Sequence, residues 1–412
     1  MRRKIYQELL QWKQRSGESA LLVQGARRVG KSYIVEAFAK AEYKSYILID
    51  FNLVDQPVKE MFEHDLVDLK TFFMKLTTYY GVKLYERESL IIFDEVQLFP
   101  RARSAIKYLV ADGRYDYIET GSLISIRENV KDILIPSEED HVDMYPLDFE
   151  EFLWANGNDT MMDFIRDCYR KKAPLGQALH RKAMDLFRQY LIVGGMPQAV
   201  NAFVKHNDFD EVDRVKRRIL NLYRDDIRKH AKGYEMKVEA IYDEIPSQMK
   251  NQNQHFKLSS LKQGARFDEY KDAMFWLSDA MIVNHCYNAT EPTFGLNLNR
   301  DRTLLKCYMG DTGLLISHAF DENGIVTGEV YKKLLLDKLE VNMGMVMENM
   351  VAQMLTASGH KLYFYSNSSR SDASSRMEID FLIAKSQISN RHNISPTIKL
   401  RFKARQPAVS FS

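Results

Sequence analysis

The feature that most constrains the fold of this chain is a glycine-containing loop between an apolar run and an amphipathic segment. Residues 21–35 read LLVQGARRVGKSYIV, which matches the pattern GxxxxGK[ST] from Gly25 to Ser32. The apolar residues 21–23 predict a short buried strand, and apolar residues at helical spacing after Ser32 predict a helix. In such an arrangement, backbone N–H groups turn inward above a helix N-terminus and bind phosphate. The alternative is an ordinary glycine-containing turn.

The side chains of this loop have separate expected roles. Lys31 is predicted to reach the β- and γ-phosphates of a nucleotide, and the Ser32 hydroxyl is predicted to hold Mg²⁺. Lys31 is therefore also a predicted catalytic residue. The residues expected to surround the nucleotide are Gly25, Ala26, Arg27, Arg28, Val29, Gly30, Lys31, Ser32 and Tyr33.

An acidic pair follows a second apolar run, in which residues 90–95 read LIIFDE. Asp94, at the end of this predicted strand, is placed to bind the water shell of Mg²⁺. Glu95 is placed to orient and deprotonate water for attack on the γ-phosphate, so the pair indicates hydrolysis rather than transfer to another molecule. The next predicted strand precedes Gly121 and Ser122. The Ser122 hydroxyl is expected to sense the γ-phosphate or the attacking water, although Thr-Gly-Ser is also a common turn.

Composition indicates packed cores without disulfide or zinc frameworks. Of the 412 residues, 45% are hydrophobic, and only three are cysteines, Cys168, Cys286 and Cys307, which lie far apart. We expect these cysteines to be small buried residues. No apolar run approaches bilayer length and no signal-peptide core follows Met1, so a cytoplasmic location without membrane contact is expected. The formal net charge of +2 is too small to indicate nucleic acid by itself.

Five blocks of sequence together carry a family resemblance. They are residues 25–32, 94–100 (DEVQLFP), 120–122 (TGS), 145–152 (YPLDFEEF) and 190–197 (YLIVGGMP). In this order they resemble prokaryotic AAA-type ATPases, related to archaeal and signal-transduction ATPases with numerous domains, that carry an uncharacterised C-terminal domain. The second and fifth blocks are the most diagnostic. The resemblance implies ATP and Mg²⁺ as cofactors, Glu95 as catalytic residue, a winged-helix module and a C-terminal segment similar to restriction endonucleases. The sequence after Ser122 departs from the serine- and asparagine-rich string usual there.

The expected fold is α/β and has three parts. Residues 1–205 are predicted to form a P-loop NTPase parallel sheet with a helical lid, and residues 206–300 a helical, winged-helix domain. Residues 301–412 are predicted to form an endonuclease-like α/β segment that is truncated or altered. In the winged-helix region we expect helices over residues 238–249, 259–262 and 266–281. The third helix could enter a DNA major groove, but its acidic solvent face opposes DNA, so a protein or interdomain contact is an equal alternative.

The C-terminal part contains two acids with nuclease-like placement, Glu348 on an amphipathic helix and Asp380 on a strand. Nucleases of the restriction type need a later Glu-x-Lys, but Thr397 stands at the position of that acid and no Asp or Glu follows Asp380. A hydroxyl does not replace a carboxylate as a strong metal ligand, so we do not expect an intact nuclease site. Our hypothesis is a frameshift after Ile394. The basic residues 385–405 are expected to be a solvated tail, with nonspecific nucleic-acid contact as the alternative.

The leading interpretation is a Mg²⁺-dependent ATPase whose nucleotide state sets the arrangement of its C-terminal modules. The alternative is a slow nucleotide-dependent switch that binds DNA or a protein partner. The resemblance also implies a homo-oligomer in which another subunit supplies an arginine. Arg188 and Arg224 are the residues of this chain considered for that role.

Overall fold

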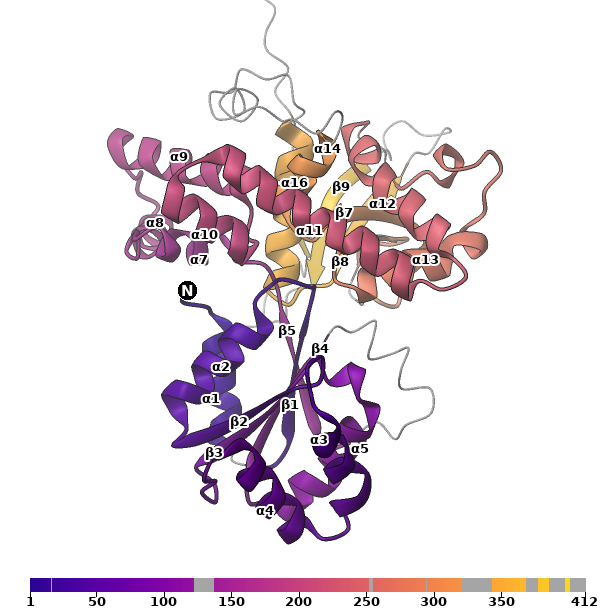
Figure 1. Ribbon diagram of the computed structural model, residues 1–412. Helices are drawn as coiled ribbons and strands as arrows, with labels where there is room; N and C mark the ends of the chain where they lie inside the picture. The colour runs from indigo at the N-terminus through magenta and orange to yellow at the C-terminus, as the bar shows by residue number, and fades with distance from the viewer. Residues whose placement is uncertain are drawn as a thin grey trace, which may run out of the picture. The chain divides into compact units, whose positions relative to one another are not determined.

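The chain divides into two compact units, residues 1–145 and residues 146–412 (Figure 1). The computed structural model describes residues 1–15, 17–121, 137–251, 255–293, 295–320, 343–367, 377–384 and 397–400. Within these residues, no helix has both the length and the apolar character needed to cross a membrane.

The first unit is built on a five-stranded parallel sheet with the strand order β2-β3-β4-β1-β5. Its strands are β1 (Ala20–Gly25), β2 (Ser45–Asp50), β3 (Ser89–Asp94), β4 (Asp116–Gly121) and β5 (Glu139–Met144). The apolar runs in β1 and β3 are continuous because helices cover both faces of a parallel sheet. Strand β4 lies between β1 and β3, and it therefore joins the strand that leads to the glycine loop with the strand that leads to the acidic pair.

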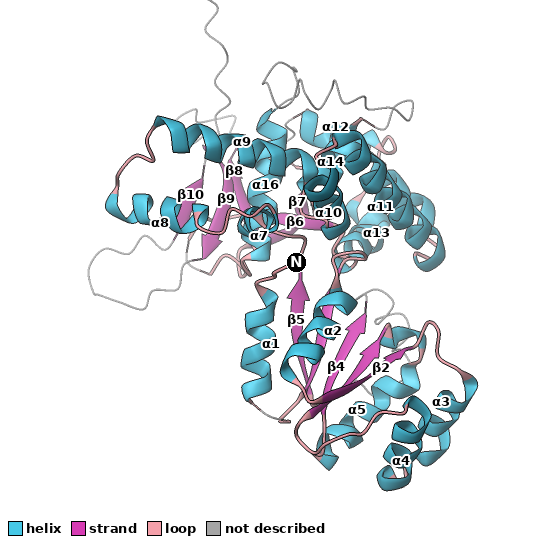
Figure 2. Ribbon diagram, turned by 60° about the vertical axis from the view of Figure 1, so that its left-hand side comes forward, coloured by secondary structure: helices cyan, strands magenta, loops and turns pink. Residues whose placement is uncertain are grey.

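Helices pack on both faces of this sheet (Figure 2). They are α1 (Ile5–Gln14), α2 (Lys31–Glu42), α3 (Gln56–Glu60), the π-helical turn η1 (Met61–Asp65), α4 (Leu69–Tyr80), the 3-10 turn η2 (Val96–Leu98) and α5 (Pro100–Asp112). Helices α3 to α5 bury an aromatic core, in which Phe62 contacts Phe51, Phe72 and Phe93 edge to face. On the other face, the apolar stripe of α2 is buried against the sheet. Residues 21–23 thus lie in a strand and residues after Ser32 in a helix, as the sequence predicts.

The second unit begins with helices. They are α7 (Phe149–Ala155), α8 (Met161–Lys171), α9 (Gln177–Val193), α10 (Pro197–His206), α11 (Phe209–His230), α12 (Glu235–Lys250), the 3-10 turn η3 (Leu258–Ser260), α13 (Phe267–Asp279), α14 (Thr312–Ala319) and α16 (Met343–Ala357). Asp148 caps α7: its carboxylate accepts the N–H of Glu151 at 2.9 Å, and the Glu151 carboxylate accepts the N–H of Asp148 at 3.1 Å. Both residues of this capping box belong to the block YPLDFEEF.

A mixed sheet with the strand order β10-β9-β8-β6-β7 completes the second unit. Its strands are β6 (Val283–Ala289), β7 (Arg300–Met309), β8 (Leu362–Asn367), β9 (Met377–Ala384) and β10 (Thr397–Leu400). Strands β6 and β8 are parallel, and the other neighbouring pairs are antiparallel. The hairpin of β6 and β7 therefore belongs to the same sheet as the strands that follow α16.

The compact units differ from the three segments expected from the sequence. Helices after residue 146 group with the C-terminal part because α9 packs on α11 and α14, and α10 packs on α11. One sheet also runs across the expected border at residue 300. Helices α12 and α13 agree with two of the three predicted near residues 238–281, and the middle one is the short turn η3. The assignment of these elements to a winged helix stays a prediction.

A buried polar network gives the block YLIVGGMP a structural role. The N–H of Leu147 donates to the carbonyl of Gly195 at 2.7 Å, and the hydroxyl of Tyr190 donates to the carbonyl of Leu147 at 2.7 Å. A Cβ on Gly195 would lie 2.1 Å from the carbonyl oxygen of Leu147, so this position needs glycine. The N–H of Gly195 donates to Asp311 at 2.6 Å, and Asp311 also caps α14. The blocks YPLDFEEF and YLIVGGMP thus hold each other in place.

Candidate functional site

The loop after β1 has the backbone that phosphate binding requires. Arg28 and Gly30 have positive φ angles of 72° and 97°, and α2 begins directly afterwards at Lys31. A side chain at Gly30 would be strained in this conformation. A Cβ on Gly25 would lie 2.3 Å from the carbonyl oxygen of Met144. Steric constraints therefore require glycine at both glycine positions of the sequence pattern. The turn leads into the N-terminus of α2, where backbone N–H groups lack helical partners.

Lys31 is buried within this loop. Its Nζ donates to the carbonyl of Gly25 at 3.0 Å and to the carbonyl of Ala26 at 3.1 Å. The side chains of Arg27, Arg28 and Tyr33 are instead exposed. The ammonium group of Lys31 is thus positioned beside the loop's backbone, where a phosphate group would meet a positive charge.

Asp94 and Ser32 lie together at the carboxyl ends of the parallel strands. Asp94 ends β3 and is only 8% exposed, and the Ser32 hydroxyl donates to its Oδ1 at 2.8 Å. The hydroxyl of Thr120 on β4 donates to the same carboxylate. Hydroxyl and carboxylate oxygens are the ligands that Mg²⁺ prefers, so this donor set fits the expected ion. Ligands of open α/β sheets bind at this edge.

Glu95 follows Asp94 in a conformation that is unusual for its residue type. Its φ and ψ are 54° and 44°, a left-handed conformation that costs about 1 kcal/mol or more outside glycine. The N–H of Glu95 donates to the hydroxyl of Thr120 at 3.3 Å, and its carboxylate accepts a hydrogen bond from the side-chain amide of Gln97. Sequence reasoning missed Thr120 and Gln97 as partners of the acidic pair, although both stand within the quoted blocks.

The roles expected for three further residues, Ser122, Arg188 and Arg224, stay predictions. Ser122 lies outside the described residues, so its role as a sensor stays a prediction. Arg188 and Arg224 both pair with acids of the same chain, Asp185 at 3.3 Å and Asp243 at 3.1 Å. A role for either arginine in another subunit's site also stays a prediction.

A second group of buried acids lies in the first unit, away from the phosphate loop. Glu119 precedes Thr120 on β4, and because side chains alternate along a strand, it points to the face opposite Asp94. Burial raises the pKa of Glu119, and the charge of Glu139 adds to that rise. Burial likewise raises the pKa of Glu139 to about 7, against the opposing effect of Arg103, whose guanidinium lies 2.8 Å away. These acids are buried in the fold and do not reach the proposed phosphate site.

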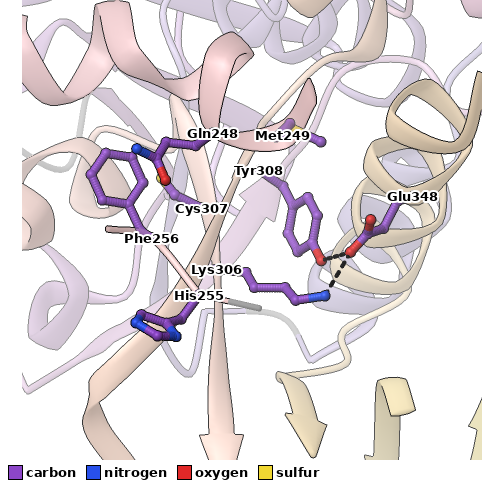
Figure 3. Close-up of a pocket in the computed structure, with 8 residues that line it drawn as sticks. All are labelled: Gln248, Met249, His255, Phe256, Lys306, Cys307, Tyr308 and Glu348. Carbon is purple, nitrogen blue, oxygen red and sulfur yellow. Dashed lines mark hydrogen bonds and ion pairs between the residues drawn. The ribbon is translucent and has the colours of Figure 1, made fainter. Parts of the chain in front are cut away.

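The two nuclease-like acids of the second unit meet at a lysine. Nζ of Lys306, on β7, lies 2.9 Å from Oε1 of Glu348 and 3.6 Å from Oδ1 of Asp380. Figure 3 shows the side chains of Lys306 and Tyr308 both directed at Glu348. Burial opposes charge on Lys306, but the two acids raise its pKa overall.

Lys306 therefore neutralises Glu348 and Asp380, the two acids whose placement in the sequence resembles that of nuclease metal ligands. Across the described residues, no group of three or more His, Cys, Asp or Glu side chains is arranged to hold a metal ion. The side chain of Thr397 lies outside the described part of the structure. No local sequence pattern links Lys306 to Glu348, because the two residues are 42 positions apart in the chain.

Taken together, the parallel sheet, the glycine loop before α2 and the buried acid at the end of β3 define a P-loop nucleotide-binding domain. Residues 17–153 match the family model of an AAA domain, and residues 184–323 match that of a domain of unknown function (DUF8612). The chain thus carries an AAA-type P-loop domain followed by an uncharacterised domain, as the resemblance implied. The AAA domain indicates binding and hydrolysis of ATP.

Solved structures share parts of this arrangement at low similarity. A Walker-type ATPase of Pyrococcus abyssi is 13% identical, with a TM-score of 0.43 over 77% of this chain and 95% of that protein. Orc1 of Aeropyrum pernix in complex with DNA is 10% identical, with a TM-score of 0.29 over 79% and 94%. The RuvB branch migration motor of Thermotoga maritima is 11% identical, with a TM-score of 0.30 over 69% and 89%. At these scores the likenesses do not define an activity. A search of curated protein sequences finds no match.

Proposed function

We propose that this protein is a Mg²⁺-dependent ATPase whose cycle of ATP binding and hydrolysis changes the arrangement of its C-terminal modules. The observation that carries the proposal is the hydrogen bond from the Ser32 hydroxyl to Oδ1 of Asp94, at 2.8 Å, beside the loop that contains Lys31. Glu95 directly follows Asp94 in the chain. The AAA match over residues 17–153 supports ATP as the nucleotide.

Each group has a distinct task in the proposed reaction. The N–H groups of the loop and the ammonium of Lys31 bind the β- and γ-phosphates. Ser32 and Asp94 would hold Mg²⁺, which neutralises charge on the phosphate oxygens when it is bound. Glu95 accepts a proton from the attacking water as the water oxygen bonds to the γ-phosphorus. The bond from that phosphorus to the leaving oxygen breaks, and ADP and inorganic phosphate are formed.

A slow nucleotide-dependent switch is the second candidate function. The hydrogen bond from Gln97 to Glu95 favours it, because a carboxylate held in this way must be released or reoriented before it can activate water. The partner of such a switch would be a protein rather than DNA at α13. Asp268, Glu269 and Asp272 on this helix are all exposed, and their charge opposes a phosphate backbone.

Nucleotide binding tests the shared basis of both functions. Isothermal titration of ATP with Mg²⁺ should show binding by the wild-type protein and a loss of about 100-fold or more in affinity for Lys31→Ala, because charged contacts to phosphate are lost. Lys40→Ala is the matched control, since Lys40 lies on the same helix and pairs with Glu36 at the surface. Equal affinities of Lys31→Ala and Lys40→Ala would contradict the proposed site.

Phosphate release distinguishes the two functions. An ATPase that drives its modules should release phosphate through many turnovers, whereas a switch should stop near one turnover. Adding duplex DNA tests the partner: stimulation by DNA would contradict the preference for a protein partner.

A further inference from the structure

Arg3, which precedes α1, is a buried arginine in contact with the phosphate loop. It is 7% exposed, and its guanidinium donates from Nη1 to the carbonyl of Val29 at 3.0 Å and from Nη2 to the carbonyl of Tyr145 at 2.6 Å. All three residues belong to the first compact unit. One side chain therefore bridges the middle of the loop and the last residue of the unit.

The carbonyl of Val29 needs such a donor. Val29 is fully buried and lies between Arg28 and Gly30, whose left-handed conformations shape the turn. For the loop's N–H groups to converge on a phosphate, carbonyls must point away from it, and a buried carbonyl without a partner is costly. Arginine supplies a charge-assisted hydrogen bond at this point.

Three other carbonyls of the loop accept from different donors. Those of Gly25 and Ala26 accept from Lys31, the residue that is expected to move toward a bound phosphate. The carbonyl of Gly30 accepts from the N–H of Ile34 within α2. Arg3 is thus a donor to the loop that is independent of the phosphate-binding lysine.

The second contact of Arg3 lies where the chain leaves the first unit. Tyr145 follows β5, and β5 pairs with β1 in a register that sets Met144 beside Gly25. The close approach of Gly25 to the carbonyl of Met144 is a second point at which the loop meets this exit segment. A shift of the loop on phosphate binding would therefore act on residues 144–145 through two contacts.

We propose that Arg3 is a positioning residue that holds the phosphate loop in its binding form and couples the loop to residues 144–145. The inference rests on the proposed nucleotide-binding function. Because Arg3 acts through the Val29 carbonyl and not on Glu95, its loss should weaken ATP binding without slowing hydrolysis of bound ATP. Lysine cannot replace it fully, since the planar fork of arginine is what spans two carbonyls.

Binding and turnover of Arg3→Ala, Arg3→Lys and the neighbouring control Arg2→Ala test the positioning role. Arg3→Ala should raise both the Kd and the KM for ATP about tenfold or more, which corresponds to about 1.4 kcal/mol, and leave kcat within about twofold. Arg3→Lys should lie between Arg3→Ala and wild type, and Arg2→Ala should match wild type. An unchanged Kd, or a loss confined to kcat, would overturn the role. If Arg3→Ala does not fold, the Kd, KM and kcat of Arg3→Lys are compared with those of Arg2→Ala, and the same criteria decide the role of Arg3.

Hydrogen exchange tests the coupling. In the wild type, saturation with ATP and Mg²⁺ should alter amide exchange at residues 144–145. In Arg3→Ala, or in Arg3→Lys if only that variant folds, this nucleotide-dependent change should be lost or reduced even at saturation. If Arg3 had a purely structural role, the variant would change the exchange rates of the ATP-free and ATP-bound protein equally. The difference in exchange between these two states would then stay as in the wild type, and this result would refute the coupling. Absence of ATP binding by the wild type would instead remove the proposed function itself.

Discussion

Replacing Asp311 with alanine is expected to destabilise the second unit by about 3 kcal/mol. Asp311 is 1% exposed, and its carboxylate accepts the N–H of Gly195 at 2.6 Å and the N–H of Leu314 at 2.9 Å. The bond to Leu314 caps α14, and loss of a cap costs about 1 kcal/mol. The bond to Gly195 joins α14 to the turn after α9, and a buried donor that loses a charged acceptor costs about 2 kcal/mol.

Two smaller effects oppose each other in this variant. The fully buried Lys216 loses a nearby negative charge, which adds to the destabilisation, whereas relief from burying a carboxylate subtracts from it. Asp311→Asn should fall between alanine and wild type. Its amide oxygen can still accept from Leu314, but its NH₂ group would face the N–H of Gly195.

Urea unfolding measures this effect. In a Trp12→Phe background, the remaining tryptophans, Trp154 and Trp276, both report on the second unit. The matched control is Asp163→Ala, which removes an exposed acid that pairs with Arg166 on α8 and should leave the midpoint unchanged. A loss below about 1 kcal/mol for Asp311→Ala would refute the structural role of the buried network.

Two further predictions concern Gln97 and Lys216. Gln97→Ala should raise kcat for ATP hydrolysis several-fold and leave the Kd for ATP unchanged, because it removes the hydrogen bond that must otherwise be released before the Glu95 carboxylate can activate water. Phosphate release and titration check this, and a lowered kcat or a changed Kd would contradict it. Burial lowers the pKa of Lys216 to about 8, so between pH 8 and 10.5 the unfolded chain binds a proton that the folded chain has lost. The unfolding free energy of the wild type relative to Lys216→Met should therefore rise from pH 7 to pH 10 by up to about 3 kcal/mol, and a flat difference would contradict the burial of this charge.

The phosphate loop could be predicted because its signal is local. Eight consecutive residues specify the turn, and the apolar runs on either side specify the strand and the helix. The contact between Ser32 and Asp94 spans 62 residues, yet it was predictable because the loop after β1 and the last residue of β3 lie at the edge formed by the carboxyl ends of the parallel strands.

The partners of these residues could not be predicted in the same way. Thr120 reaches Asp94 because β4 lies between β1 and β3. The order of strands in a sheet cannot be deduced from the sequence of any single segment. Arg3 reaches Val29 across 26 residues, and Lys306 reaches Glu348 across 42. Each is a single basic residue among many, without a local pattern that marks its partner.

The grouping of helices shows the same limit. Amphipathic spacing predicts that helices after residue 146 bury one face, but it does not say which element covers that face. In the structure, α9 packs on α14, a helix more than a hundred residues later in the chain. The block YLIVGGMP is diagnostic of the resemblance in the sequence. Its physical role becomes clear only in the structure, where the N–H of Gly195 donates to Asp311.

The most direct test of the ATPase proposal is phosphate release by Glu95→Gln after the protein has been loaded with ATP and Mg²⁺. We predict that this variant binds ATP with wild-type affinity and hydrolyses it at least about 100 times more slowly than the wild type, as expected for loss of a general base. Hydrolysis at the wild-type rate, with ATP bound at Lys31 and Ser32, would contradict the assignment of Glu95 and with it the proposed reaction.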